Sequence, residues 1–229
     1  MLTQRKKKIL KKVVEKYIKK ARPVSSKTLV KKDFPEFSSA TIRNEMLDLT
    51  RKGLLLQPHT SAGRIPTLAG FRFFLENFLK EKKLSNFEKD IFLQVKREYG
   101  DKRKRIKELA KRLAEISKEL VIIAFSKDDF YYTGFSYLFR QPEFKNLSLV
   151  ENISQIIDHL DETMKNIFDK IKKLEILIGE KNPFGDKCGA ILDRIEIDNK
   201  KIIVGLLGPL RMDYNKNIGL IRSLKNFLK

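Results

Sequence analysis

The stretch SSATIRNEMLDLTRKGLLLQPHTSAGRIPT, residues 38–67, decides what the first third of the chain should look like. Ser38 is a residue type that caps the start of a helix, and Gly53 is a type that ends one. A helix is therefore predicted over 39–52. The apolar run 54–56 that follows predicts a short strand.

The residues on either side of this strand extend the pattern. Residues 58–66, which include small polar residues, Gly and Arg, predict an exposed loop, and Thr67 is expected to cap a further helix. Upstream, the lysine-rich residues 4–20 and the segment SKTLVKKDF (26–34) show the apolar spacing and the caps of two more helices. Three helices followed by a strand, a loop and a return are typical of a winged helix-turn-helix.

The predicted helix over 39–52 has one apolar face. At 100° per residue, Ile42, Met46 and Leu49 fall within a narrow arc that should face the core. Small residues at the start of a helix allow close approach to a major groove, where Arg can pair with guanine and Asn with adenine. A capped amphipathic helix with a solvated outer face is the alternative for each residue taken alone. The residues across or beside the opposite face are Ala40, Thr41, Arg43, Asn44, Asp48 and Arg51.

The start of this helix and the loop supply further candidates. Ser38 and Ser39, with the helix N-terminus, are suited to meet a phosphate. Gly63 is expected to let the loop turn while Arg64 projects toward a minor groove or phosphates. The other loop residues are interpreted as phosphate contacts or turn formers. The predicted DNA-binding residues are Ser38, Ser39, Ala40, Thr41, Arg43, Asn44, Arg51, His59, Thr60, Ser61, Gly63 and Arg64.

Positive charge is concentrated at the beginning of the chain, whose formal net charge is +20. Residues 1–82 hold 20 Lys and Arg against 7 Asp and Glu, an excess of 13, and residues 83–229 hold 29 against 22, an excess of 7. This implies a polyanionic partner, nucleic acid before an anionic membrane surface. We expect the lysines of 4–20 to neutralise phosphates. A general Lys-rich bias is the alternative.

The later part of the chain changes character. Residues 83–120 are charged and helical in pattern, with a break at Gly100, and predict a helical linker. Apolar runs and amphipathic segments over 121–229 predict an antiparallel sheet with helices. The expected fold is α+β and multidomain: a winged-helix domain over 1–82, a linker over 83–120 and a sheet domain over 121–229.

Several elements are expected within the sheet domain. A tight turn is predicted at SKDD and a hairpin turn at DNKK. A helix is predicted over roughly 146–172 and another over about 214–227. The β-like segments are LVIIAF, FYYTGFSYLF, KLEILIG, CGAILDRIEID and KIIVGLLG.

Other functional classes lack support in the sequence. The single Cys188 cannot form an internal disulfide, which fits a reducing compartment. The start MLTQRKKKILKK has no apolar signal region, and no run approaches ~18 apolar residues. No catalytic or metal-ligating constellation is visible, so we expect no enzyme, metal or cofactor. The expected location is the cytoplasm, on the nucleoid, without membrane contact.

The segments SSATIRNEMLDL, GLLLQPHTSAGRIPT and the Gly70–Phe71–Arg72 that follows closely resemble the heat-inducible transcription repressor HrcA family. The resemblance resumes at LFRQPEF (138–144), IGEKNP (178–183) and LLGPLRMDYNK (206–216). It implies a repressor with a winged-helix domain and a GAF-like domain. It also implies a homodimer on an inverted-repeat operator before chaperone operons, kept active by the GroEL chaperonin.

One departure from the family pattern concerns the sheet domain. Family members usually carry additional sheet and an inserted dimerisation domain between the linker helix and the RQPEF segment. Here KELVIIAF passes through SKDD straight into FYYTGF, so the insert is absent and the sheet is expected to be trimmed. A dimer would then form through the linker helices, the sheet domain or the operator itself.

Two further functions remain open at this point. The GAF-like domain could sense a small ligand, which would make the chain a ligand-gated winged-helix regulator. The diffuse lysine content also fits a protein that coats RNA or DNA without sequence preference.

Overall fold

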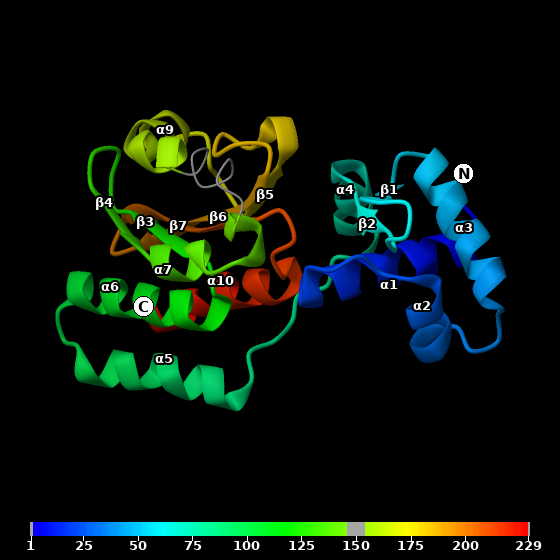
Figure 1. Ribbon diagram of the computed structural model, residues 1–229. Coiled ribbons are helices and arrows are strands. Elements are labelled where there is room, and N and C mark those ends of the chain that lie inside the picture. The colour runs from blue at the N-terminus through cyan, green and yellow to red at the C-terminus, as the bar shows by residue number, and fades with distance from the viewer. Residues whose placement is uncertain (1, 146–153, 229) are drawn as a thin grey trace. The chain divides into compact units, whose positions relative to one another are not determined.

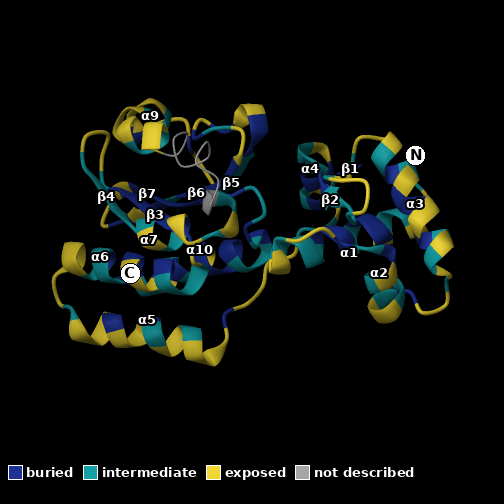
Figure 2. Cartoon of the chain, viewed as in Figure 1, coloured by how far each residue is buried: buried dark blue, intermediate teal, exposed yellow. Residues whose placement is uncertain are grey.

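The computed structural model describes residues 2–145 and 154–228, and the chain divides into two compact units, Met1–Leu79 and Lys80–Lys229 (Figure 1). Each unit has its own buried core (Figure 2). The expected linker over 83–120 is part of the second unit, because its helices pack against the sheet and the last helix of that unit.

The first unit is formed mainly by helices. Its helices expected over 4–20, 26–34 and 39–52 and its short strand are confirmed, each within a residue or two of the expected ends. The elements are α1 (Gln4–Lys20), α2 (Ser26–Asp33), α3 (Ser39–Arg51), β1 (Leu55–Leu56), β2 (Ile65–Pro66) and α4 (Leu68–Phe78).

Hydroxyl side chains set where these helices begin. The Oγ atoms of Ser25 and Ser38 accept hydrogen bonds from backbone N–H groups in the first turns of α2 and α3, and Thr67 caps α4 in the same way. Such caps satisfy N–H groups that have no partner inside the helix. At the other end of α3, Gly53 adopts φ +70°, a conformation that favours glycine, and the chain turns into β1.

The core of the first unit brings the apolar faces of α1, α3 and α4 together. Ile42 and Leu49 are fully buried and Met46 is nearly so, which confirms the predicted inner face of α3. The two strands pair antiparallel, with Leu55 opposite Pro66. This pairing returns the chain toward α4, with residues 57–62 as the tip of a hairpin and Gly63 and Arg64 at its base.

The second unit is built on a five-stranded antiparallel sheet with the order β4-β3-β7-β6-β5. The expected hairpin turn between β6 and β7 is confirmed: Asp198 and Asn199 both adopt positive φ, as in the tight turns that suit a twisted hairpin. The strands are β3 (Leu120–Ala124), β4 (Phe130–Thr133), β5 (Glu175–Ile178), β6 (Cys188–Ile197) and β7 (Lys200–Pro209).

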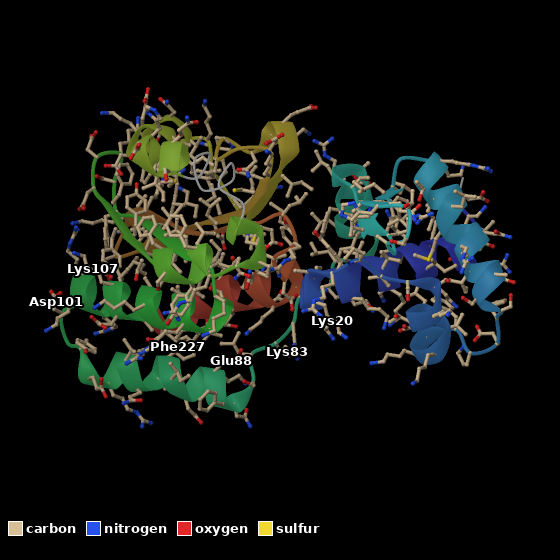
Figure 3. The ribbon with its side chains drawn as sticks, in the orientation of Figure 1. Lys20, Lys83, Glu88, Asp101, Lys107 and Phe227 are labelled. Carbon is tan, nitrogen blue, oxygen red and sulfur yellow. The ribbon has the colours of Figure 1, made fainter. Side chains whose placement is uncertain are left out.

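Helices cover both faces of this sheet (Figure 1). On one side α6 (Lys102–Ser117) and α10 (Tyr214–Leu228) pack on the sheet and α5 (Asn86–Glu98) packs on them. The ring of Phe92 in α5 lies 5.4 Å from that of Phe227 in α10, the latter labelled in Figure 3. On the other side α9 (Leu160–Ile167) closes a second apolar layer.

Two expectations for the second unit need correction. The β-like segment FYYTGFSYLF is a strand only over its first four residues, because Gly134 adopts φ +99° and a short helix, α7 (Phe135–Phe139), follows. The helix expected over roughly 146–172 lies partly outside the described residues. In its described part the helix is interrupted at His159 and α9 ends at Ile167.

Candidate nucleic-acid interface

A groove of about 550 Å³ lies between the start of α2, one edge of α3 and the tip of the β1–β2 hairpin. Its cationic side chains are Lys27, Arg43 and Arg64, and none of the described residues that line it is an Asp or Glu. Hydroxyl and amide groups complete the polar lining: Ser25, Ser26, Gln57, Thr60 and Ser61. Cations and hydrogen-bond donors without opposing carboxylates suit a polyanion.

The outer face of α3 is open to solvent (Figure 2). Ala40, Arg43, Asn44 and Arg51 are exposed, and Thr41 is half-buried. Within the described part of the chain, the side chains of Arg43 and Asn44 make no hydrogen bond or ion pair. These two side chains are therefore available to a ligand, whereas Arg51 lies 3.8 Å from Asp48.

The hydroxyl groups at the start of α3 already have partners in the protein. Ser38 Oγ accepts from Thr41 N at 3.0 Å and lies 2.9 Å from Thr41 Oγ1. Ser39 is half-buried, and its Oγ lies 2.9 Å from that of Ser26 in α2. The two serines therefore cap α3 and join it to α2. A phosphate at this point would meet backbone N–H groups first.

The hairpin tip is held in shape by an amide side chain. Gln57 Nε2 donates to the carbonyl oxygens of Thr60 at 2.6 Å and Ala62 at 3.0 Å. His59, Thr60 and Ser61 are exposed. The tip thus presents these three side chains outward on a loop whose own backbone is partly satisfied by Gln57.

The expected roles of Gly63 and Arg64 need correction. Gly63 does not use positive φ; instead, a Cβ on it would lie 2.3 Å from the carbonyl oxygen of Val24, so glycine is needed for close approach. Arg64 does not project freely. It exchanges two backbone hydrogen bonds with Val24, of 2.8 and 2.9 Å, and its Nε donates to Thr50 Oγ1 at 3.1 Å.

The opposite edge of α3 is occupied by ion pairs with α1. Glu45 is only 7% exposed, and its Oε1 accepts from Arg5 Nε at 2.7 Å. Asp48, expected on the outward face, instead accepts from Lys6 Nζ at 2.8 Å. This hydrogen bond lowers the pKa of Asp48 and raises the pKa of Lys6. Both acids therefore attach α3 to α1.

Several lysines of α1 are also occupied. Lys16 pairs with Asp33 at 2.7 Å, and Lys12 lies near Asp33 and Glu15. Lys8, Lys19 and Lys20 are exposed and have no ion pair within the described residues. Only part of the lysines of α1 are therefore available to neutralise phosphates.

Sequence reasoning missed Lys27 and Gln57 as lining residues of the groove. Lys27 directly follows the two serines that begin α2, and a lysine beside a helix start is a signal that could have been used. Gln57 had no such signal, because its role depends on the fold of the hairpin tip.

A second polar cluster lies inside the second unit. Glu119 is 4% exposed, and its Oε2 has no hydrogen-bond partner in the described structure. Burial raises the pKa of Glu119 well above its usual range. Nearby, Arg211 donates to Gln141 Oε1 at 2.8 Å and Glu143 Oε2 at 2.9 Å. This joins the segments 138–144 and 206–216 that carry the family resemblance.

Among the described helices, none is both long and apolar enough to cross a membrane. The described residues likewise contain no group of three or more His, Cys, Asp or Glu side chains placed to hold a metal ion.

Comparison with known proteins identifies relatives over the whole chain. A heat-inducible transcription repressor HrcA of Natranaerobius thermophilus is 26% identical, covering 99% of this chain and 96% of that protein. One from Acetivibrio thermocellus is 34% identical, covering 91% of this chain and 59% of that protein. One from Carboxydothermus hydrogenoformans is 42% identical over 52% of this chain and 34% of its own length.

The chain is shorter than these relatives. The match to the Natranaerobius protein runs over 333 residues, 104 more than the 229 of this chain, so that relative has at least 104 residues without a counterpart here. This agrees with the expected absence of an inserted segment.

A solved structure and a family model complete the comparison. A crystal structure described as a hypothetical protein at 2.2 Å resolution superposes with a TM-score of 0.78, covering 100% of this chain and 98% of that one at 18% identity, which shows a shared fold. The family model described as HrcA protein C terminal domain matches residues 37–218, most of the chain. The chain belongs to the HrcA family.

Proposed function

We propose that this protein is a DNA-binding transcription repressor of heat-shock (chaperone) operons that binds an inverted-repeat operator as a homodimer. The first unit acts as a winged-helix domain and the second as a GAF-like domain. Family membership supports the repressor role, since the relatives bear that name. The main support for DNA binding is the groove that Lys27, Arg43 and Arg64 line, because none of its described lining residues is acidic.

The outer face of α3 provides base readout in this proposal. Ala40 and Thr41 allow the first turn to approach a major groove, and Arg43 and Asn44 reach base edges. Arg51 lies near the end of the same helix, within reach of the DNA backbone. Phosphates approach the first turn of α3 at Ser38 and Ser39.

The hairpin and α2 provide contacts to the DNA backbone. His59, Thr60 and Ser61 lie at the exposed tip and contact phosphates or the adjacent minor groove. Gly63 and Arg64 form the base of the hairpin, where Arg64 shares the groove with Lys27. Because these contacts come from two further segments beside α3, they fix its register on the duplex.

Dimerisation and chaperone control complete the proposal. An inverted-repeat operator has twofold symmetry, so two copies of α3 would read its two halves. Without the segment that relatives carry, the partner surface lies on α5, α6 or the sheet domain, or the operator brings the copies together. We propose that the GroEL chaperonin maintains the folded second unit. Heat then diverts the chaperonin to other clients and derepresses the operon.

Competition binding tests this proposal. A duplex selected from a randomised pool should contain an inverted repeat, and it should outcompete bulk DNA at physiological salt. Solution mass should correspond to two chains on that duplex. Equal affinity for both DNAs would instead indicate a protein that coats nucleic acid without sequence preference.

A further inference from the structure

We propose that Thr50 is a positioning residue for DNA recognition, which holds Arg64 so that the outer edge of its guanidinium group faces the groove. The inference rests on the proposed DNA-binding function. It adds a residue that makes no contact with DNA itself and acts through Arg64.

The hydrogen bonds around Thr50 have a defined direction. Thr50 Oγ1 donates its single hydrogen to the carbonyl oxygen of Met46 at 2.9 Å, one turn back along α3. Its lone pairs are therefore free to accept, and Arg64 Nε donates to the same oxygen at 3.1 Å. The chain from Arg64 through Thr50 to Met46 ties the base of the hairpin to α3.

The backbone of Arg64 is fixed as well. Its N–H donates to Val24 at 2.8 Å, its carbonyl accepts from Val24 at 2.9 Å, and Gly63 allows this close approach because it has no Cβ. With the backbone held on one side and Nε held on the other, the side chain has few remaining orientations. Pre-ordering of this kind reduces the entropy lost on binding.

This arrangement leaves the outer nitrogens of Arg64 unused. A guanidinium group has five N–H donors, and only the one on Nε is bonded within the described part of the chain. The four donors on Nη1 and Nη2 remain for phosphate oxygens or base edges. A lysine would have one nitrogen for both tasks, so the arrangement requires arginine.

Thr50 also lies on the same edge of α3 as Arg43. The two residues are seven positions apart, nearly two full helical turns, and Arg43 lines the groove with Arg64. The hydrogen bond that Arg64 donates to Thr50 therefore sets the position of one groove cation relative to the other, and this spacing matters because the phosphates of a duplex have fixed spacing.

Thr50→Val tests the inference because valine keeps the shape and removes the hydroxyl. We expect the affinity for the selected duplex to fall about three- to tenfold, with the salt dependence unchanged because no charge is lost. Thr50→Ser keeps the hydroxyl and should bind within about twofold of wild type. In an Arg64→Lys background, Thr50→Val should have little further effect.

A measurement without DNA separates this inference from the proposed function. The ¹⁵N–¹H signal of Arg64 Nε should be observable in the wild type and in Thr50→Ser and should shift in Thr50→Val. If the signal behaves so while the wild type shows no DNA preference, the DNA-binding proposal fails and the positioning role fails with it. Equal binding by wild type and folded Thr50→Val, or an equal loss in Thr50→Ser, would overturn the positioning role alone.

Discussion

The two edges of α3 use charge in opposite ways. On the edge that faces α1, Glu45 is buried against Arg5, and Asp48 lies 2.8 Å from Lys6. On the edge that faces the groove, Arg43 is exposed and has no ion pair within the described residues. Acidic side chains on one edge of α3 thus form ion pairs with α1, and a cationic side chain on the other edge is open to a ligand. The net charge of a domain therefore overstates the number of cations that can contact DNA.

Gly63→Ala should have the largest effect, because it changes the support of the whole groove edge. The new Cβ would lie 2.3 Å from the carbonyl oxygen of Val24, which forces the hairpin away from the segment that precedes α2. We expect the free energy of unfolding of the first unit to fall by about 3 kcal/mol and DNA binding to be lost. Urea denaturation and duplex titration measure the two effects.

Gly100→Ala is the matched control for that change. An added Cβ there meets no atom within 4 Å, so stability should change little. Equal stability of the two variants would show that the hairpin does not depend on the contact between Gly63 and Val24.

Arg43→Ala should act on binding without acting on stability. Loss of a base contact should cost about 1–3 kcal/mol on the selected duplex and relax the sequence preference at one position in each half-site. The melting temperature should stay unchanged because the side chain has no partner in the described protein. Selection of binding sites with the variant gives the preference; an unaltered preference would remove Arg43 from base readout.

Glu45→Gln, on the other edge of α3, should act in the opposite way, on stability and not on DNA binding. It removes the charge that faces Arg5 and Lys6, and because Arg5 is partly exposed we expect a loss of about 1 kcal/mol in the free energy of unfolding. The dependence of DNA affinity on salt should not change. A variant that is fully stable but has an altered salt dependence would contradict the division between the two edges.

Lys27→Ala and Lys16→Ala compare a cation that lines the groove with one held in an ion pair. Lys27 lines the groove, whereas Lys16 lies 2.7 Å from Asp33. Removing a phosphate contact should reduce the slope of log affinity against log salt by about 0.9, so we expect this for Lys27→Ala only. Equal slopes for the two variants would mean that both lysines reach the DNA or that neither does.

Asp48→Asn should have the smallest effect, a loss of stability that is present near neutral pH and disappears in acid. Lys6 lowers the pKa of Asp48 in the folded protein, so this carboxyl adds stability above its unfolded pKa of about 4 and loses it as pH falls through the lower folded value. Wild type should therefore lose stability faster than Asp48→Asn below about pH 4. Denaturation curves at pH 6 and pH 3 test this, and parallel losses would exclude the contribution.

Local patterns explain which parts of the fold could be predicted. Caps such as Ser38 and Thr67, and the apolar spacing of Ile42, Met46 and Leu49, depend on residues within one or two turns of each other. The strands of the second unit follow from apolar runs and from the turn at Asp198 and Asn199. The short helix after Gly134 was not foreseen because it depends on the positive φ of Gly134, and the apolar spacing over 146–172 did not indicate the break at His159.

For this protein the sequence alone determined most of the helices and strands, most of the exposed face of α3 and the excess of positive charge near the N-terminus. Only the tertiary structure decided which of those charges remain available. Lys6 donates to Asp48, and the Nε of Arg64 donates to Thr50. Gly63 must be glycine because the backbone of Val24 approaches it closely. The Lys6–Asp48 contact joins residues 42 positions apart, and the Arg64–Thr50 contact joins residues 14 positions apart. Gly63 meets the backbone of Val24, which belongs to a different segment. A local sequence pattern does not predict such contacts, because they form only when the core brings distant segments together.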